Sequence, residues 1–453
     1  MSGGDSVDDQ RDPAVGQATR LGRSRLGRLS RRRVVQAAAA AAAGGLTARG
    51  GSPRPRRIVV RSSWQTVNIG DIAHTPGILR LLENHLPEAE VWLWPSNVGN
   101  GVRELLAARF PRVRVLDPRK DVAEIFRECD FLLHGSGPSL VARRDVRRWR
   151  EKTGKPYGVY GITLDPFFVP DAKRPAGSEN EAISDSLDLL ATADFVFFRD
   201  SRSLAFARDQ GCPCPIMQFG PDAAFATDLR DDASAERFLR AHGLEPGRFL
   251  CCIPRYRFTP YWRLPEKNRP VDPVRKARNE ALKEHDHAPH RRAIERVLRE
   301  TGLRLLVCPE DRTQMAIGKE MLVDPLPALV RQGVVWRPNY WLTGEAVSTY
   351  VRSAGLFGNE MHSPIMAVGN GVPAIVCRWR EQTTKGFMWQ DIGLGDWLFN
   401  MDDEADVQQI VPTVLRMAAA PGAARETAAA ARRFVEQRQR ETMAVVGECL
   451  ARS

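Results

Sequence analysis

From residue 58 onward the sequence repeats one pattern: a short apolar run, a glycine or proline break, and a longer segment of helical periodicity. Strands that alternate with helices in this way are typical of a doubly wound parallel sheet flanked by helices. The pattern therefore predicts an α/β fold. It also directs the search for a site to the strand ends, because ligands of open parallel sheets bind beyond the carboxyl ends of the strands.

The apolar runs form two successive groups, one in each half of the chain. The predicted strands are residues 58–61, 90–94, 113–116, 130–134, 157–160, 195–198 and 216–219, followed by 249–253, 304–307, 334–336, 355–357 and 373–376. Helical periodicity covers residues 72–85, 102–110, 141–152, 181–191, 201–210, 290–300, 344–352, 364–370, 406–417 and 425–449. Two such sheets that face one another would leave a cleft between them.

A chain of 453 residues, 43% hydrophobic and 27% charged, is too long for one ordinary core and too apolar to be disordered. We therefore expect two packed domains, at residues 58–230 and 245–453, joined by a polar connection near residues 228–247. A basic leader, residues 1–57, precedes them. A proline-rich, charged insertion near residues 255–289 belongs to the second domain, and excursions of this length are more often functional or mobile than structural.

The leader carries most of the excess positive charge. It holds 12 Arg and 4 Asp, which is +8 of the formal net charge of +11. Without a basic stripe or a recognisable module, this charge does not indicate nucleic-acid binding. Residues 30–35 read Ser-Arg-Arg-Arg-Val-Val and precede an alanine- and glycine-rich run, as in a twin-arginine export signal. The alternative is a disordered basic tail on a cytoplasmic protein. No segment is apolar for long enough to predict a transmembrane helix.

The sequence gives no strong indication of a metal or another cofactor. Eight cysteines are scattered without two Cys-x-x-Cys units, which argues against a zinc site. His285, Asp286, His287 and His290 gather in or beside the insertion, where a metal site and a solvated loop are the two interpretations. Their spacing matches no standard ligand pattern and the insertion is polar, so we expect an exposed loop without a metal.

Polar motifs follow several predicted strands of the first half. Asn68, Gly70 and Asp71 open a helix, where free backbone amides suit an anion or a hydroxyl, although Asp71 could simply cap the helix. Arg199 ends a buried strand and could bind a carboxylate or phosphate. Asp222 follows the next strand and either reaches the cleft or holds the turn.

A small-residue loop follows the fourth predicted strand. Its central members are Gly135, Ser136 and Gly137. Such a loop either lets a ligand approach the backbone closely or makes a tight turn, and the residues alone favour neither interpretation.

The strongest motif is Gly-Asn-Glu-Met-His-Ser-Pro at residues 358–364, which leads from a strand into a short helix. Pro364 suits the first turn, and residues 371–373 return the chain to the next strand. His362 therefore stands at a helix N-terminus that faces the cleft. The helix dipole would lower its pKa and Glu360 would raise it, so we expect the pair to hold a transferable proton near neutrality.

Taken in order, these motifs resemble those of the polysaccharide pyruvyl transferase family. The likeness covers most of residues 58–395, and although no single motif is specific, the ordered set is. Its elements are the motif at residues 68–71, the loop at residues 130–137, Arg199-Asp200-x-x-Ser203, Asp222, residues 362–373 and Lys385. The resemblance implies two Rossmann-like domains in a GT-B-like arrangement.

The resemblance also implies a reaction and its participants. A pyruvyl group would pass from phosphoenolpyruvate to paired hydroxyls of a glycan or a lipid-linked sugar, giving a ketal and free phosphate. His362 would protonate the enol carbon, and Asp71 or Asp222 would orient or deprotonate the acceptor hydroxyl. Arg199 and Lys385 would hold the carboxylate and the phosphate.

Glu360 departs from the family pattern, which commonly has Arg two residues before the His. A carboxylate in the pocket of a multiply charged anion costs affinity unless a cation compensates. The candidates are Arg199, Arg255, Arg378 and Lys385.

An exported enzyme would also lack phosphoenolpyruvate, a cytoplasmic metabolite. Two alternatives therefore stay open: a glycosyltransferase-like or other glycan-modifying enzyme on the same fold, and a catalytically silent glycan-binding protein.

Overall fold

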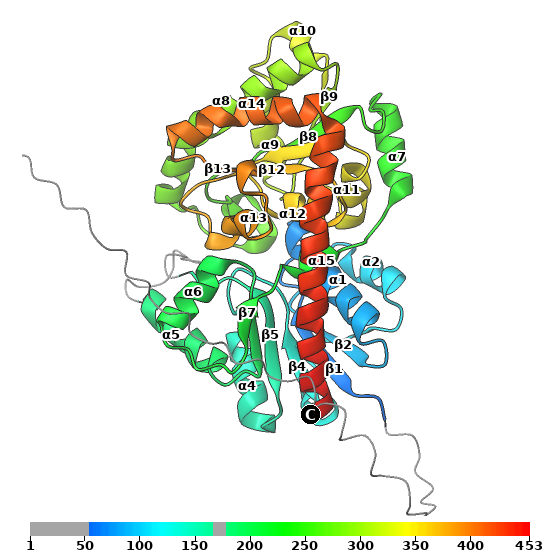
Figure 1. Cartoon of the computed structure of the whole chain (residues 1–453), viewed down its shortest axis with the longest axis vertical. Helices are drawn as coiled ribbons and strands as arrows, with labels where there is room; N and C mark the ends of the chain where they lie inside the picture. Colours follow the sequence, from blue (N-terminus) through cyan, green and yellow to red (C-terminus); the bar gives the residue numbers. More distant parts are fainter. Residues whose placement is uncertain (1–53, 166–177) are drawn as a thin grey trace, which may run out of the picture. The chain divides into compact units, whose positions relative to one another are not determined.

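The first half of the chain forms one seven-stranded parallel sheet in the order β3-β2-β1-β4-β5-β6-β7 (Figure 1). The computed structural model describes residues 54–165 and 178–453, so the predicted export signal lies outside the described residues. The strands are β1 (Arg57–Ser62), β2 (Glu90–Pro95), β3 (Arg114–Val115), β4 (Phe131–His134), β5 (Tyr157–Ile162), β6 (Phe195–Phe198) and β7 (Met217–Phe219). The central strands are almost entirely buried and mostly apolar, as expected for a sheet covered on both faces.

Helices connect these strands and cover the sheet. They are α1 (Ile69–His85), α2 (Val102–Arg109), α3 (Val122–Glu128), α4 (Arg143–Thr153), α5 (Ser178–Leu190) and α6 (Ser201–Asp209). A single helical turn, η1 (Ala223–Ala226), follows β7, and α7 (Asp232–Ala241) leads towards the second half.

The second half forms a six-stranded parallel sheet in the order β10-β9-β8-β11-β12-β13. Its strands are β8 (Phe249–Ile253), β9 (Arg304–Val307), β10 (Val334–Trp336), β11 (Gly355–Gly358), β12 (Ala374–Arg378) and β13 (Leu398–Asn400). Its helices are α8 (Pro273–Glu300), α9 (Gln314–Gly318), α10 (Ala328–Arg331), α11 (Thr343–Tyr350), α12 (His362–Gly369), α13 (Met388–Asp391), α14 (Glu404–Ala419) and α15 (Pro421–Arg452). None of the helices in the described ranges has the length and apolar character needed to cross a membrane.

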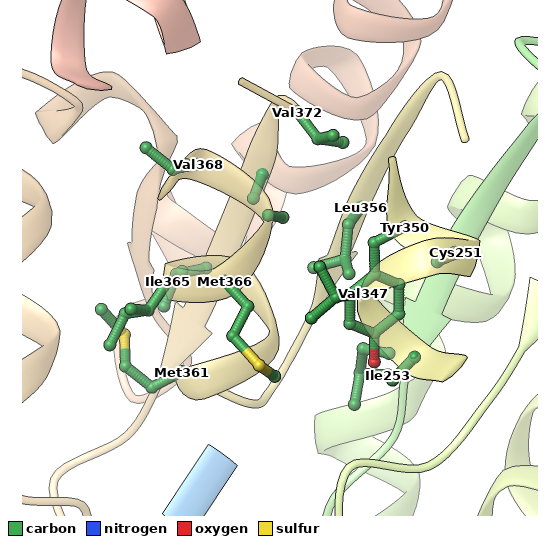
Figure 2. Packing of buried hydrophobic residues seen from close by; sticks show 14 of the residues in the cluster. Cys251, Ile253, Val347, Tyr350, Leu356, Met361, Ile365, Met366, Val368 and Val372 are labelled. Atoms are coloured by element: carbon green, nitrogen blue, oxygen red, sulfur yellow. The ribbon is translucent and has the colours of Figure 1, made fainter. Parts of the chain in front are cut away.

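Helix α12 is anchored in the core of the second half. Met361 before it, and Ile365 and Met366 within it, belong to one buried cluster with Val347 and Tyr350 of α11 (Figure 2). All of these side chains are at most 1% exposed. This packing fixes the start of α12, and therefore the position of His362.

The expectation of an exposed loop at His285, Asp286, His287 and His290 is wrong. These residues lie in the 28-residue helix α8, and Asp286, His287 and His290 are buried. The guanidinium of Arg257 donates two hydrogen bonds to the Asp286 carboxylate, at 2.8 and 2.9 Å. The polar side chains thus pack inside the second half through an ion pair with a residue distant in sequence.

The last helix, α15, packs against both halves (Figure 1). Ala431 and Val435, in its first half, belong to the same buried cluster as α11 and α12. Met443 and Val446, further along, pack with Ile78 of α1 in the core of the first half. The hydroxyls of Tyr160 and Thr442 are hydrogen-bonded at 3.1 Å.

Candidate functional site

Two helix N-termini, one from each half, meet beyond the carboxyl ends of β1 and β11. Asn68 caps α1, because its Oδ1 accepts hydrogen bonds from the backbone N–H groups of Gly70 (2.8 Å) and Asp71 (3.1 Å). Helix α12 begins at His362. A Cβ atom on residue 70 would lie 2.0 Å from the Cβ of His362, so the approach of the two helices requires glycine there.

Gly70→Ala is expected to destabilise the protein by about 1–3 kcal/mol, because the added methyl group would push α1 and His362 apart. Gly422 offers a matched control, since it lies in the first turn of α15 and a Cβ there meets nothing within 4 Å. Gly422→Ala should be neutral or slightly stabilising. Urea unfolding of both variants measures the difference, and equal effects would contradict the packing argument.

His74, which the sequence analysis did not single out, lies at the centre of the site. It is fully buried, and its Nδ1 donates a hydrogen bond to Oδ1 of Asp222 at 2.9 Å. The Arg199 guanidinium donates to the other oxygen of Asp222 at 2.7 Å, and the backbone N–H of Ala224 donates to Oδ1 at 2.9 Å. Burial opposes ionisation, but His74 and Arg199 hold the pKa of Asp222 well below its usual range. Asp222 therefore orients His74, and its two oxygens are already engaged.

Asp71 faces His74 and does not cap the helix. Its Oδ1 lies 3.8 Å from Nε2 of His74, and its other oxygen accepts a hydrogen bond from the Gln65 amide. Burial would raise the pKa of Asp71, but His362 and His74 lower it below the usual value for an aspartate. Asp71 is thus an ionised carboxylate beside two imidazoles.

His362 contacts this group from the second half. Its ring centroid lies 4.9 Å from that of His74, with the two rings nearly perpendicular at 88°. Its Nδ1 lies 3.3 Å from Oε1 of Glu310, a fully buried carboxylate that follows β9. Burial and the Lys385 cation lower the pKa of His362 well below its ordinary value. The pKa of His362 therefore lies below the expected balance near neutrality.

Glu360 pairs with Arg255 and not with His362. The Arg255 guanidinium donates to Oε2 of Glu360 at 2.7 Å, and the Gln314 amide donates to Oε1 at 2.5 Å. Burial raises the pKa of Glu360 to about 7, against the opposing effect of Arg255. Among the four cations proposed to compensate for Glu360, Arg255 is the one that forms an ion pair with it.

Lys385 and Arg199 differ in their contacts with other side chains. Arg199 is 1% exposed, and besides Asp222 it donates to the Thr163 hydroxyl at 2.7 Å, so it supports the site from within the protein. Lys385 forms no ion pair with a residue of the described part of the chain. Burial, with the cations of Arg199 and Arg255, lowers its pKa to about 8. Lys385 thus remains available for an anionic ligand.

The small-residue loop after β4 packs against protein groups. The Ser136 hydroxyl, fully buried, accepts a hydrogen bond from the backbone N–H of Ala223 at 2.9 Å and so supports the turn that follows Asp222. A Cβ on Gly135 would lie 2.9 Å from the Ser62 hydroxyl, and one on Gly137 would lie 3.1 Å from Val141. The loop therefore shapes the base of the site through close backbone packing.

Arg378 lines a separate hollow of about 560 Å³ at the carboxyl ends of β12 and β13. The lining residues are Asp165, Arg278, Arg378, Arg380, Glu381, Gln382, Thr384, Phe387, Asn400 and Asp402. The Arg378 guanidinium lies over the Phe387 ring, 4.6 Å from its centroid. Because Thr384 precedes Lys385, this hollow adjoins that lysine along the chain.

The structure thus brings the predicted residues Asp71, Asp222 and His362 together, and it adds His74 and Glu310, which the sequence analysis missed. Asp71, His74 and His362 are also of the residue types that bind metals, and one ligand atom of each lies within 4.8 Å of the others. His74 lies three residues after Asp71, hence on the same face of α1. Glu310 follows the carboxyl end of β9, so a search for polar residues after every predicted strand would have found it.

These features define the class: a GT-B-like α/β protein with two Rossmann-like sheets and a site built from both. Solved structures support this fold assignment, although at their low sequence identity they show the fold alone. S. aureus MnaA with UDP has a TM-score of 0.51 and 11% identity over 84% of this chain and 95% of its own. A putative UDP-N-acetylglucosamine 2-epimerase from Listeria monocytogenes has a TM-score of 0.53 and 12% identity, and the match covers 88% of this chain and 97% of its own. Anabaena HepE with UDP and glucose has a TM-score of 0.52 and 10% identity, and the match covers 88% of this chain and 100% of its own.

The sequence itself identifies the family. The family model of polysaccharide pyruvyl transferases matches residues 68–381, and the chain belongs to this family. A search of curated proteins found no match. Both the α/β fold with two parallel sheets and the family resemblance drawn from the motifs are confirmed, and the family indicates a transferase.

Proposed function

We propose that this transferase moves a pyruvyl group from phosphoenolpyruvate to two hydroxyls of a glycan sugar, forming a ketal. The observation that carries the proposal is the opposition of His362 and His74, whose rings are 4.9 Å apart and come from different halves of the chain. One imidazole can donate a proton while the other accepts one, as the addition of a hydroxyl across an enol double bond requires.

In the proposed reaction, His362 gives its proton to C3 of phosphoenolpyruvate, and one acceptor hydroxyl attacks C2 and loses its proton to His74. Phosphate then leaves with the electron pair of the C2–O bond, and the second hydroxyl adds to C2 and gives its proton to the phosphate. The low pKa of His362 suits a polyanionic donor, because the negative charges of a bound donor would raise that pKa. Lys385 would bind the phosphate or carboxylate.

The direct test is incubation with phosphoenolpyruvate and a panel of sugar glycosides that carry paired hydroxyls. Release of phosphate with an equal amount of acid-labile ketal, detected by mass spectrometry and NMR, is the expected result. No product with any acceptor, together with no stabilisation by phosphoenolpyruvate in thermal melts, would contradict the proposal.

Glu360→Gln is expected to tighten phosphoenolpyruvate binding about tenfold, or ~1.4 kcal/mol, because it removes a carboxylate and frees Arg255 for the anion. The amide keeps the size of the side chain beside Gln314. Glu345→Gln is the control, because Glu345 forms a comparable ion pair with Arg337 at 2.8 Å outside the site. Isothermal titration calorimetry checks both variants. Unchanged binding by Glu360→Gln would place this pair outside the donor pocket.

A second candidate function is transfer or conversion of a nucleotide-linked sugar. The observation in its favour is that two solved structures with this fold, those of MnaA and HepE, hold UDP. Thermal melts with UDP-sugars against phosphoenolpyruvate discriminate the candidates, because a ligand raises the melting temperature only when it binds the native state. Stabilisation by glycan alone, without turnover of either donor, would favour the silent glycan-binding protein.

A further inference from the structure

We infer that Asp71, His74 and His362 form a two-histidine, one-carboxylate site for a divalent transition-metal ion such as Zn²⁺. Potential ligand atoms of the three residues lie within 4.8 Å of one another, and Nε2 of His74 is 3.8 Å from Oδ1 of Asp71. Ligand atoms at about 2.0–2.1 Å from a tetrahedral ion are roughly 3.4 Å apart. Small side-chain movements would therefore close the three ligands on one ion.

The two imidazoles present unused nitrogen atoms. His74 is fully buried and His362 is 5% exposed. Within the described part of the chain, Nε2 of each ring has no hydrogen-bond partner. Buried polar atoms are nearly always partnered in native proteins, so two neighbouring exceptions that lie beside a carboxylate point to a missing ligand.

Each proposed ligand is also held from behind. Asp222 accepts the Nδ1 hydrogen of His74 at 2.9 Å, which leaves Nε2 as the lone-pair nitrogen in the neutral ring. Oε1 of Glu310 lies 3.3 Å from Nδ1 of His362, as an ion-pair distance without hydrogen-bond geometry, and the Gln65 amide donates to Asp71. Histidine ligands of metal ions characteristically carry a carboxylate or carbonyl partner on the other ring nitrogen.

The donor set selects the class of ion. Two imidazoles and one carboxylate suit Zn²⁺, Co²⁺ or Ni²⁺, whereas Mg²⁺ and Ca²⁺ prefer oxygen ligands throughout. Three protein ligands leave a coordination position open.

Metal binding itself does not depend on the reaction proposed above. One consequence rests on that reaction: a bound ion would occupy the lone pairs that His74 and His362 need, so the metal-loaded protein would be inhibited.

The test is titration of the full, substrate-free chain with ZnCl₂ by calorimetry and with CoCl₂ by visible absorption. We expect one equivalent to bind, with the d–d bands of four- or five-coordinate Co²⁺, and no heat from MgCl₂. His74→Gln and His362→Gln should each weaken binding by at least about 100-fold, whereas His85→Gln, in the last turn of the same helix α1, should bind like wild type. Circular dichroism establishes whether each variant is folded. If one of the histidine variants does not fold, Asp71→Asn takes its place in the titration.

Failure of wild type to bind either ion, or stoichiometric binding retained by both site histidine variants, would overturn the inference. The two proposals fail separately. If the protein binds the metal in titrations, and a separate assay of the chelator-treated protein shows no pyruvyl transfer, the metal site is supported and the proposed reaction is contradicted. If transfer does occur, ZnCl₂ should suppress it and a chelator should restore it, and zinc-insensitive turnover at saturating metal would overturn the inference.

Discussion

Replacing His362 by alanine should lower turnover by about 10²–10⁴-fold, the usual contribution of a positioned general acid. Gly70 and the core around α12 hold the His362 backbone, so the truncation removes the imidazole without displacing the helix. Steady-state measurement of phosphate release checks the rate.

The control for this variant is His85→Ala, because His85 lies in the last turn of α1 and outside the site. Circular dichroism and thermal melts should show that both variants are folded. A His362→Ala enzyme with wild-type turnover would remove His362 from the mechanism, and so would an equal loss of rate in His85→Ala.

Asp222→Asn should cost about 3–5 kcal/mol of stability, the range typical when one partner of a buried ion pair is removed. Arg199 is 1% exposed and Asp222 is fully buried, so the amide would leave the guanidinium without a counter-charge and without water. Guanidinium unfolding measures the loss.

Glu124→Gln provides the comparison, because Glu124 pairs with Arg114 at 2.7 Å on the surface, where solvent replaces the lost partner. It should unfold almost like wild type. If Asp222→Asn proved as stable as Glu124→Gln, the link from Arg199 through Asp222 to His74 would not hold the site together.

Uninterrupted apolar runs made the strands predictable. The predicted runs at residues 195–198 and 304–307 coincide with β6 and β9, because strands buried on both faces need mostly apolar residues. The strand β13 was not predicted from the sequence. The first part of α8 was missed because proline and charge suggest a loop, whereas Pro289 lies inside the helix and Arg257 neutralises Asp286.

The site was predictable only in part, for a similar reason. Asp71 and His362 adjoin a strand end and a helix start, which are recognisable in sequence. The partners of Asp222 and Glu360 are not, because Asp222 meets His74 across 148 positions and Glu360 meets Arg255 across 105. The sequence shows which charges a site contains, but the tertiary fold decides which of them neutralise one another.

The path of α15 bears on how this protein matures during synthesis. Met443 and Val446 fill the core that Ile78 and the first sheet leave open, so the first half exposes apolar surface until these late residues have been translated. A chain truncated after residue 420 would therefore contain the strands of both sheets but lack the helix that packs against them. Such a chain should bind chaperones and be sensitive to protease, and the first half should become resistant only when α15 is present and folded against it.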